Sequence, residues 1–163
     1  MNPHANILQA IGNTSLVQLQ KVVPKRCARI YAKLEWENPT GSMKDRTAQA
    51  MIARAEEDGR LKPGDTIVEY TGGSTGISLA LICVAKGYKL HIVTSDAFSK
   101  EKLKHMEALG AKLTMVPSEG GLTTKKLILD MIAAAKEISQ QPNTYWTNSV
   151  TTAVSDGRTT TVQ

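Results

Sequence analysis

Two short segments of the 163-residue chain combine residue types that could bind and activate a small molecule. In one of them, residues 70–76 read Tyr-Thr-Gly-Gly-Ser-Thr-Gly, directly before a segment of helical character. Glycines let backbone N–H groups approach a ligand, and the N-terminus of a helix attracts anions. The segment therefore indicates a cradle for a carboxylate or phosphate. The alternative is a plain strand-to-helix turn capped by Ser74 or Thr75.

The other segment, residues 38–46, reads Asn-Pro-Thr-Gly-Ser-Met-Lys-Asp-Arg and leads into another predicted helix. An amine at the start of a helix faces the positive end of the helix dipole, which disfavours its charged form. A neutral amine can act as a nucleophile or form a Schiff base, so Lys44 is a candidate for covalent chemistry. The alternative is a surface lysine paired with Asp45, with Asp45 and Arg46 forming a solvated helix start.

These segments must be positioned by a folded domain, and the composition predicts one. The chain is 41% hydrophobic with a net charge of +5, values typical of a globular domain rather than a disordered one. The spacing of Cys27 and Cys83 and of the three histidines predicts neither a disulfide framework nor a metal site. Basic and acidic residues are interleaved, so we expect no nucleic-acid partner. The sequence shows no membrane span and no secretory signal, and we expect a cytoplasmic protein.

Short apolar runs alternate with longer segments of helical periodicity along the chain. The expected strands cover residues 28–34, 65–70, 89–94, 111–116 and 144–146. The expected helices cover residues 42–58, 75–86, 99–109 and 122–140. This alternation predicts an α/β fold, with a parallel sheet and helices on both of its faces. Ligands of such sheets bind at the carboxyl ends of the strands, where we expect both candidate segments to lie.

Several motifs in order closely resemble the cysteine synthase family. They are residues 11–17 (IGNTSLV), residues 33–35 (KLE), residues 38–46 and the glycine-rich residues 71–76. This family belongs to the fold-type II pyridoxal-phosphate enzymes, which are similar to the β-subunit of tryptophan synthase and include cystathionine β-synthase. The resemblance extends from about Asn6 to Asn148. It implies that pyridoxal 5′-phosphate is the cofactor and that this chain corresponds to the smaller domain of the family's fold.

The resemblance also assigns roles to individual residues. It implies that Lys44 forms a Schiff base with the cofactor and later takes the α-proton of the substrate. Ser74 stands where the family usually has an asparagine that contacts the cofactor, and Gly72 stands where it usually has a serine. These two departures leave the substrate more open than the cofactor. The residues implied to bind the substrate carboxylate are Thr71, Gly72, Gly73, Ser74 and Thr75.

The chain divides into three parts by this resemblance. Residues 1–36 would belong with a larger domain, residues 37–148 form the smaller domain, and residues 149–163 form a Thr-rich tail that fits neither. The family's loop for the cofactor phosphate and its partner for the pyridine nitrogen have no match here. We therefore expect a truncated form that is weakly active or inactive by itself.

The activity implied for the parent enzyme is β-replacement on O-acetylserine by sulfide, which gives cysteine. A small amino-acid substrate and a homodimer are the expected partners, with no nucleic acid and no membrane. One alternative is a cystathionine β-synthase or a serine or threonine dehydratase of the same fold. Another is a non-catalytic fragment or an anion-binding module.

Overall fold

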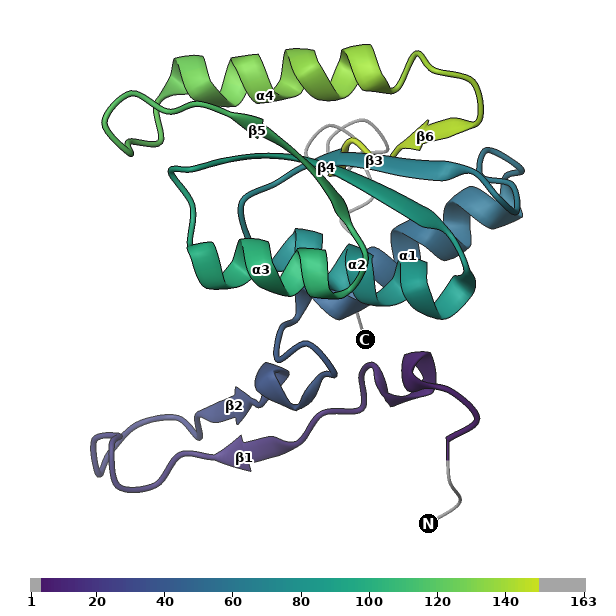
Figure 1. Ribbon diagram of the computed structural model, residues 1–163. Coiled ribbons are helices and arrows are strands. Elements are labelled where there is room, and N and C mark those ends of the chain that lie inside the picture. Colours follow the sequence, from purple (N-terminus) through teal and green to yellow (C-terminus); the bar gives the residue numbers. More distant parts are fainter. Residues whose placement is uncertain (1–3, 150–163) are drawn as a thin grey trace.

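The structure is a computed structural model, and it describes residues 4–149 of the chain. A four-stranded sheet lies at its centre, with one helix on one face and three helices on the other (Figure 1). A small antiparallel hairpin near the N-terminus lies beyond the three-helix layer (Figure 1). The predicted α/β fold, with helices on both faces of a parallel sheet, is therefore confirmed.

The four strands of the central sheet are all parallel and run in the order β5-β4-β3-β6. Their bounds are Thr66–Tyr70 for β3, Lys89–Ser95 for β4, Lys112–Val116 for β5 and Thr144–Trp146 for β6. The helices are α1 (Lys44–Glu57), α2 (Ser74–Lys86), α3 (Lys100–Ala108) and α4 (Lys125–Ile138). Because β3 lies between β4 and β6, the loop that follows β3 leaves the sheet from its interior.

Alternating side chains of the central strands build an apolar core on each face of the sheet. Ile67 and Ile92 are fully buried in the cluster that includes residues of α1, α2 and α3. Val68 and Val93 belong to the second cluster, where they pack with Met131 of α4. The two faces together hold β3 and β4 rigidly, and the loops after these two strands start from fixed points.

The N-terminal segment forms its own two-stranded sheet, in which β1 (Leu16–Gln18) pairs antiparallel with β2 (Tyr31–Lys33). Short 3-10 helices, η1 (Ile7–Ala10) and η2 (Glu35–Glu37), flank this hairpin. The expected strand at residues 28–34 is thus shorter, and it is not part of the parallel series, which corrects our prediction. The short apolar run correctly indicates a strand, but the sequence does not show its partner.

The other predicted elements are confirmed, with shifts of a few residues at the ends. The largest shift is at α4, which begins at Lys125 because the Thr124 side chain accepts a hydrogen bond from the Leu127 N–H group. Gly87 ends α2 in a left-handed conformation, with φ of 80°. Residues 150–163 of the predicted tail lie outside the described residues. Within residues 4–149, no helix is long and apolar enough to cross a membrane, and no cluster of metal ligands is present.

Candidate functional site

Hydrogen bonds between two helices bring the two candidate segments together. The Asp45 carboxylate, in the first turn of α1, accepts a hydrogen bond of 2.6 Å from the Ser78 hydroxyl of α2. It also accepts bonds from the backbone N–H group of Thr40, at 2.8 Å, and from the Thr40 hydroxyl. Ser78 lies one turn after Ser74 in α2, and residues four apart share a helix face. The start of α2 therefore lies beside the loop that carries Lys44.

Asp45 is a structural anchor rather than a solvated helix residue. Its side chain is completely buried, and its three hydrogen bonds come from Thr40 and Ser78. Its place in the first turn of α1 also puts its negative charge at the positive end of the helix dipole. The alternatives of a solvated Asp45 and of a local pair between Lys44 and Asp45 are therefore wrong.

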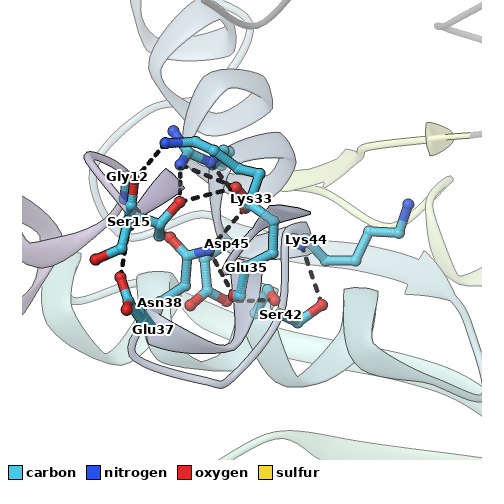
Figure 2. A network of polar contacts seen from close by, with 12 residues as sticks. Gly12, Ser15, Lys33, Glu35, Glu37, Asn38, Ser42, Lys44 and Asp45 are labelled. Carbon is cyan, nitrogen blue, oxygen red and sulfur yellow. Dashed lines mark hydrogen bonds and ion pairs between the residues drawn. The ribbon is translucent and has the colours of Figure 1, made fainter. Parts of the chain in front are cut away.

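Lys44 is the first residue of α1 and is half-buried. Its backbone N–H group donates a hydrogen bond of 3.1 Å to the Ser42 hydroxyl, which fixes the start of the helix. Its side chain extends away from the neighbouring polar network (Figure 2). Within residues 4–149, no hydrogen bond or ion pair engages its amine. The amine is therefore available to a ligand.

That polar network, formed by Thr14, Glu35, Asn38 and Arg46, joins the N-terminal segment to α1 (Figure 2). The Arg46 guanidinium binds both Glu35 carboxylate oxygens, at 3.0 and 3.1 Å. It also donates to the Thr14 hydroxyl at 3.1 Å. Asn38 donates to Glu35 and accepts a bond of 2.9 Å from the Gly12 N–H group. The network thereby holds Lys44, two residues before Arg46, in a fixed place.

The hydrogen bonds from Arg46, with smaller contributions from Thr14 and Asn38, lower the pKa of Glu35 from 4.5 to about 2. Partial burial opposes this shift and is outweighed. The carboxylate therefore stays charged well below neutral pH, and its charge favours the pairing with Arg46. Arg46 is 17% exposed at its side chain, so the alternative of a solvated Arg46 is also wrong.

The glycine-rich loop connects β3 to α2 at the carboxyl end of the sheet. Thr71 begins it, and its backbone N–H group donates to the Val93 carbonyl at 3.0 Å. The Thr71 hydroxyl accepts a bond of 3.2 Å from the Gly73 N–H group, so its hydrogen remains available to a ligand oxygen. Gly73 is the N-cap residue of α2 and provides no side-chain cap. The first turn of α2 therefore presents N–H groups that lack intrahelical partners.

Ser74 and Thr75 are half-buried residues of this uncapped first turn. Neither caps the helix, so the alternative of a turn capped by Ser74 or Thr75 is wrong. Gly76 follows them and is buried. A Cβ atom at this position would lie 2.7 Å from both Met106 Sδ and Thr71 Cγ2, which is too close for a larger residue. The small residue thus lets α2 start close to α3. The result is an open helix N-terminus with two hydroxyls, which suits an anion.

The sequence analysis missed several residues that build the site. Ser78 and Thr40 bind Asp45, and Glu35, the partner of Arg46, lies in η2 and not on the helix that carries Arg46. Phe98, in the loop after β4, packs directly on Gly72. No local sequence pattern predicts these contacts. The motifs at residues 11–17 and 33–35 mark the right segments, but not the pairing between them.

The described residues fit a part of the predicted cofactor site. An unpaired, half-buried lysine amine suits a carbonyl compound, and the uncapped start of α2, tied to the Lys44 loop through Asp45, suits a carboxylate. Fold and site together define a class of protein, an α/β domain that has a free lysine amine at the start of one helix and an uncapped start of a neighbouring helix after a strand of its parallel sheet.

Comparison with known proteins makes the class specific. Residues 7–163 match the sequence family described as pyridoxal-phosphate dependent enzyme, and the chain belongs to this family. It is 45% identical over 139 residues to a cysteine synthase of Staphylococcus aureus (strain Mu50), a match that covers 85% of this chain and 43% of that protein. The recognised family is therefore confirmed, and it is a family of enzymes that depend on pyridoxal phosphate.

Solved structures support the same assignment. The cysteine synthase of Entamoeba histolytica is similar with a TM-score of 0.76 and 36% identity, covering 90% of this chain and 44% of the other. A hydrogen sulfide-producing enzyme of Fusobacterium nucleatum is similar with a TM-score of 0.77 and 34% identity, covering 91% and 46%. The chain therefore spans less than half the length of each of these proteins.

Proposed function

We propose that this chain is the lysine-bearing part of a cysteine synthase-like enzyme, which replaces the β-substituent of O-acetylserine with sulfide and forms cysteine. The observation that carries the proposal is the pairing of two features. The free amine of Lys44 stands at the start of α1, and Asp45 and Ser78 tie that helix to the uncapped start of α2. Cysteine synthases among the similar proteins support this choice of reaction.

Each residue of the site has a role in this proposal. Lys44 would bind pyridoxal phosphate covalently through Nζ and then, once the substrate has replaced it, hold the substrate's α-proton there. The backbone N–H groups of residues 72–75 and the hydroxyls of Thr71 and Thr75 would bind the substrate carboxylate. Ser74 would lie beside the cofactor ring. The cofactor itself supplies the electron sink that stabilises negative charge on the substrate's α-carbon.

The domain assignment remains part of the proposal. Residues 37–148 would form the small domain, and the exposed apolar side chains of Leu16 (62%) and Trp36 (68%) would pack against a larger domain. Burial of such side chains stabilises a fold by about 1.5–3 kcal/mol each. We therefore propose that the 163-residue chain alone turns over its substrate slowly or not at all. From the family resemblance, we also propose that the complete enzyme is a cytoplasmic homodimer.

A covalent-labelling experiment tests the role of Lys44. The chain is incubated with pyridoxal phosphate, reduced with borohydride and digested, and the labelled peptide is identified by mass spectrometry. We expect the label on Lys44 and its loss in Lys44→Ala, whereas Lys33→Ala, the matched control, keeps it. Labelling that survives in Lys44→Ala would contradict the assignment.

A second experiment tests the carboxylate loop and the substrate. In a chain that binds the cofactor, Thr71→Ala and Thr75→Val should each weaken amino-acid binding by roughly 10- to 150-fold, since a bond to a charged group contributes about 1.5–3 kcal/mol. Cofactor absorbance should stay nearly unchanged in both variants. O-acetylserine should shift that absorbance more than serine does. A preference for serine would favour the cystathionine β-synthase or dehydratase alternative instead, and no response to either amino acid would favour a non-catalytic fragment.

A further inference from the structure

Phe98 covers the face of Gly72 from which a side chain would project. A Cβ atom added at Gly72 would lie 2.1 Å from Cγ of Phe98 and 2.2 Å from both Cδ atoms of the ring. Gly72 is not among the glycines with positive φ, so a left-handed conformation is not what requires glycine there. The contact with the aromatic ring excludes a side chain at position 72.

The ring is held in place by its surroundings. The Phe98 N–H group donates to the Ser95 carbonyl at 3.2 Å, and the next residue, Ser99, caps α3 by accepting a bond from the Lys102 N–H group. Phe98 also packs against the apolar cluster that contains Val93 and Met131. Rotation away from Gly72 would expose this apolar contact to water. Phe98 is thus a fixed part of the wall beside the glycine-rich loop.

We propose that Phe98 is a specificity-determining residue of the amino-acid site, one that limits the site to amino acids with small side chains. The inference rests on the proposed carboxylate binding by residues 71–75. An amino acid bound there places its α-carbon one bond beyond the carboxylate, and its side chain begins within reach of the loop. Since the ring fills the space beside Gly72, additional volume from the protein or from the ligand is excluded there. Gly72 and Phe98 therefore act as one unit.

Amide NMR of the full 163-residue chain measures this selectivity without turnover. L-serine and L-methionine are the small and bulky probes, and the shifts of the Gly72 and Gly73 amide signals give their dissociation constants. We expect the native chain to bind L-serine at least tenfold more tightly than L-methionine. In Phe98→Ala this ratio should fall at least fivefold. Phe98→Leu provides a milder variant, and Leu129→Ala, which removes an exposed apolar side chain of α4, is the matched control.

A second set of variants tests whether the two residues act together. Gly72→Ser should weaken L-serine binding at least tenfold, because the new side chain collides with the ring, and Gly72→Ser/Phe98→Ala should recover most of that loss. An unchanged ratio in both Phe98 variants, or an unaltered Gly72→Ser, overturns the inference while the native chain still binds L-serine. If the native chain binds neither probe, with or without pyridoxal phosphate, the proposed carboxylate site itself is refuted, and the inference with it.

Discussion

Replacement of Arg46 by glutamine tests the polar network that positions the Lys44 loop. In Arg46→Gln, the Glu35 carboxylate loses both guanidinium bonds, of 3.0 and 3.1 Å, and Thr14 loses a third of 3.1 Å. Hydrogen bonds to charged groups contribute about 1.5–3 kcal/mol. Because the two side chains are 17% and 26% exposed, solvent screening reduces this value. We expect the free energy of unfolding to fall by about 1–2 kcal/mol.

Thermal unfolding followed by circular dichroism measures this loss. For a chain of this size, it corresponds to a decrease in Tm of roughly 2–8 °C. Arg54→Gln is the matched control, since Arg54 lies on the same helix but is 63% exposed in its ion pairs with Glu57 and Asp58. Substitution there should change the stability by less than about 0.5 kcal/mol.

The pH dependence gives the second readout. The pKa of Glu35 is lowered in the folded state, from 4.5 to about 2, so its stabilising effect is present above pH 4.5. It is lost as the pH falls towards 2 and the folded-state carboxylate becomes protonated. The stability difference between the native chain and Arg46→Gln should therefore shrink between pH 4.5 and pH 2. Equal losses in Arg46→Gln and Arg54→Gln, or a difference that does not change over this range, would refute the reasoning.

Three further predictions concern the core, the helix link and the thiols. Ile52→Ala, at a fully buried position of α1, should lower the free energy of unfolding by about 2–5 kcal/mol in urea titrations, whereas Val84→Ala, 58% exposed, should change it little. Asp45→Ala should lower the free energy of unfolding by about 2–4 kcal/mol, because it leaves buried hydroxyls without their acceptor. A smaller loss of stability in Asp45→Ala than in Ser78→Ala would contradict the anchoring role. Burial raises the pKa of Cys83 to about 12, so at pH 8 a thiol reagent should modify exposed Cys27 quickly and Cys83 only on unfolding. Rapid modification of Cys83 in the folded Cys27→Ser variant, where it is the remaining thiol, would refute that assignment.

The order of helices and strands could be predicted from the sequence, because the formation of each element depends on residues that are close together in the chain. Apolar residues at helical spacing and the glycines that stop helices lie close together in the chain, as at Gly87, which ends α2. The central strands were predicted from short apolar runs. The same local logic made Lys44 and residues 71–76 candidates, since a helix start provides free N–H groups wherever it occurs. The family resemblance added the cofactor and the proposed reaction.

Contacts between distant residues needed the tertiary structure. The pairing of β3 with β6 and of β2 with β1 depends on how the chain closes its loops, and no period in the sequence encodes it. In the sequence, Asp45 and Arg46 cannot be distinguished from any other charged pair at the start of a helix. Asp45 is buried and Arg46 is half-buried because Ser78 and Glu35, 33 and 11 residues away, provide their partners.

The sequence by itself determined which segments could bind an anion and which lysine could form a covalent bond. The tertiary structure decided that these segments meet, that Asp45 joins them, and that Phe98 lies over Gly72. The physical reason is the range of the forces involved. Backbone hydrogen bonding and local hydrophobic periodicity act over a few residues, whereas packing and buried polar pairing join whichever surfaces the completed sheet brings into contact.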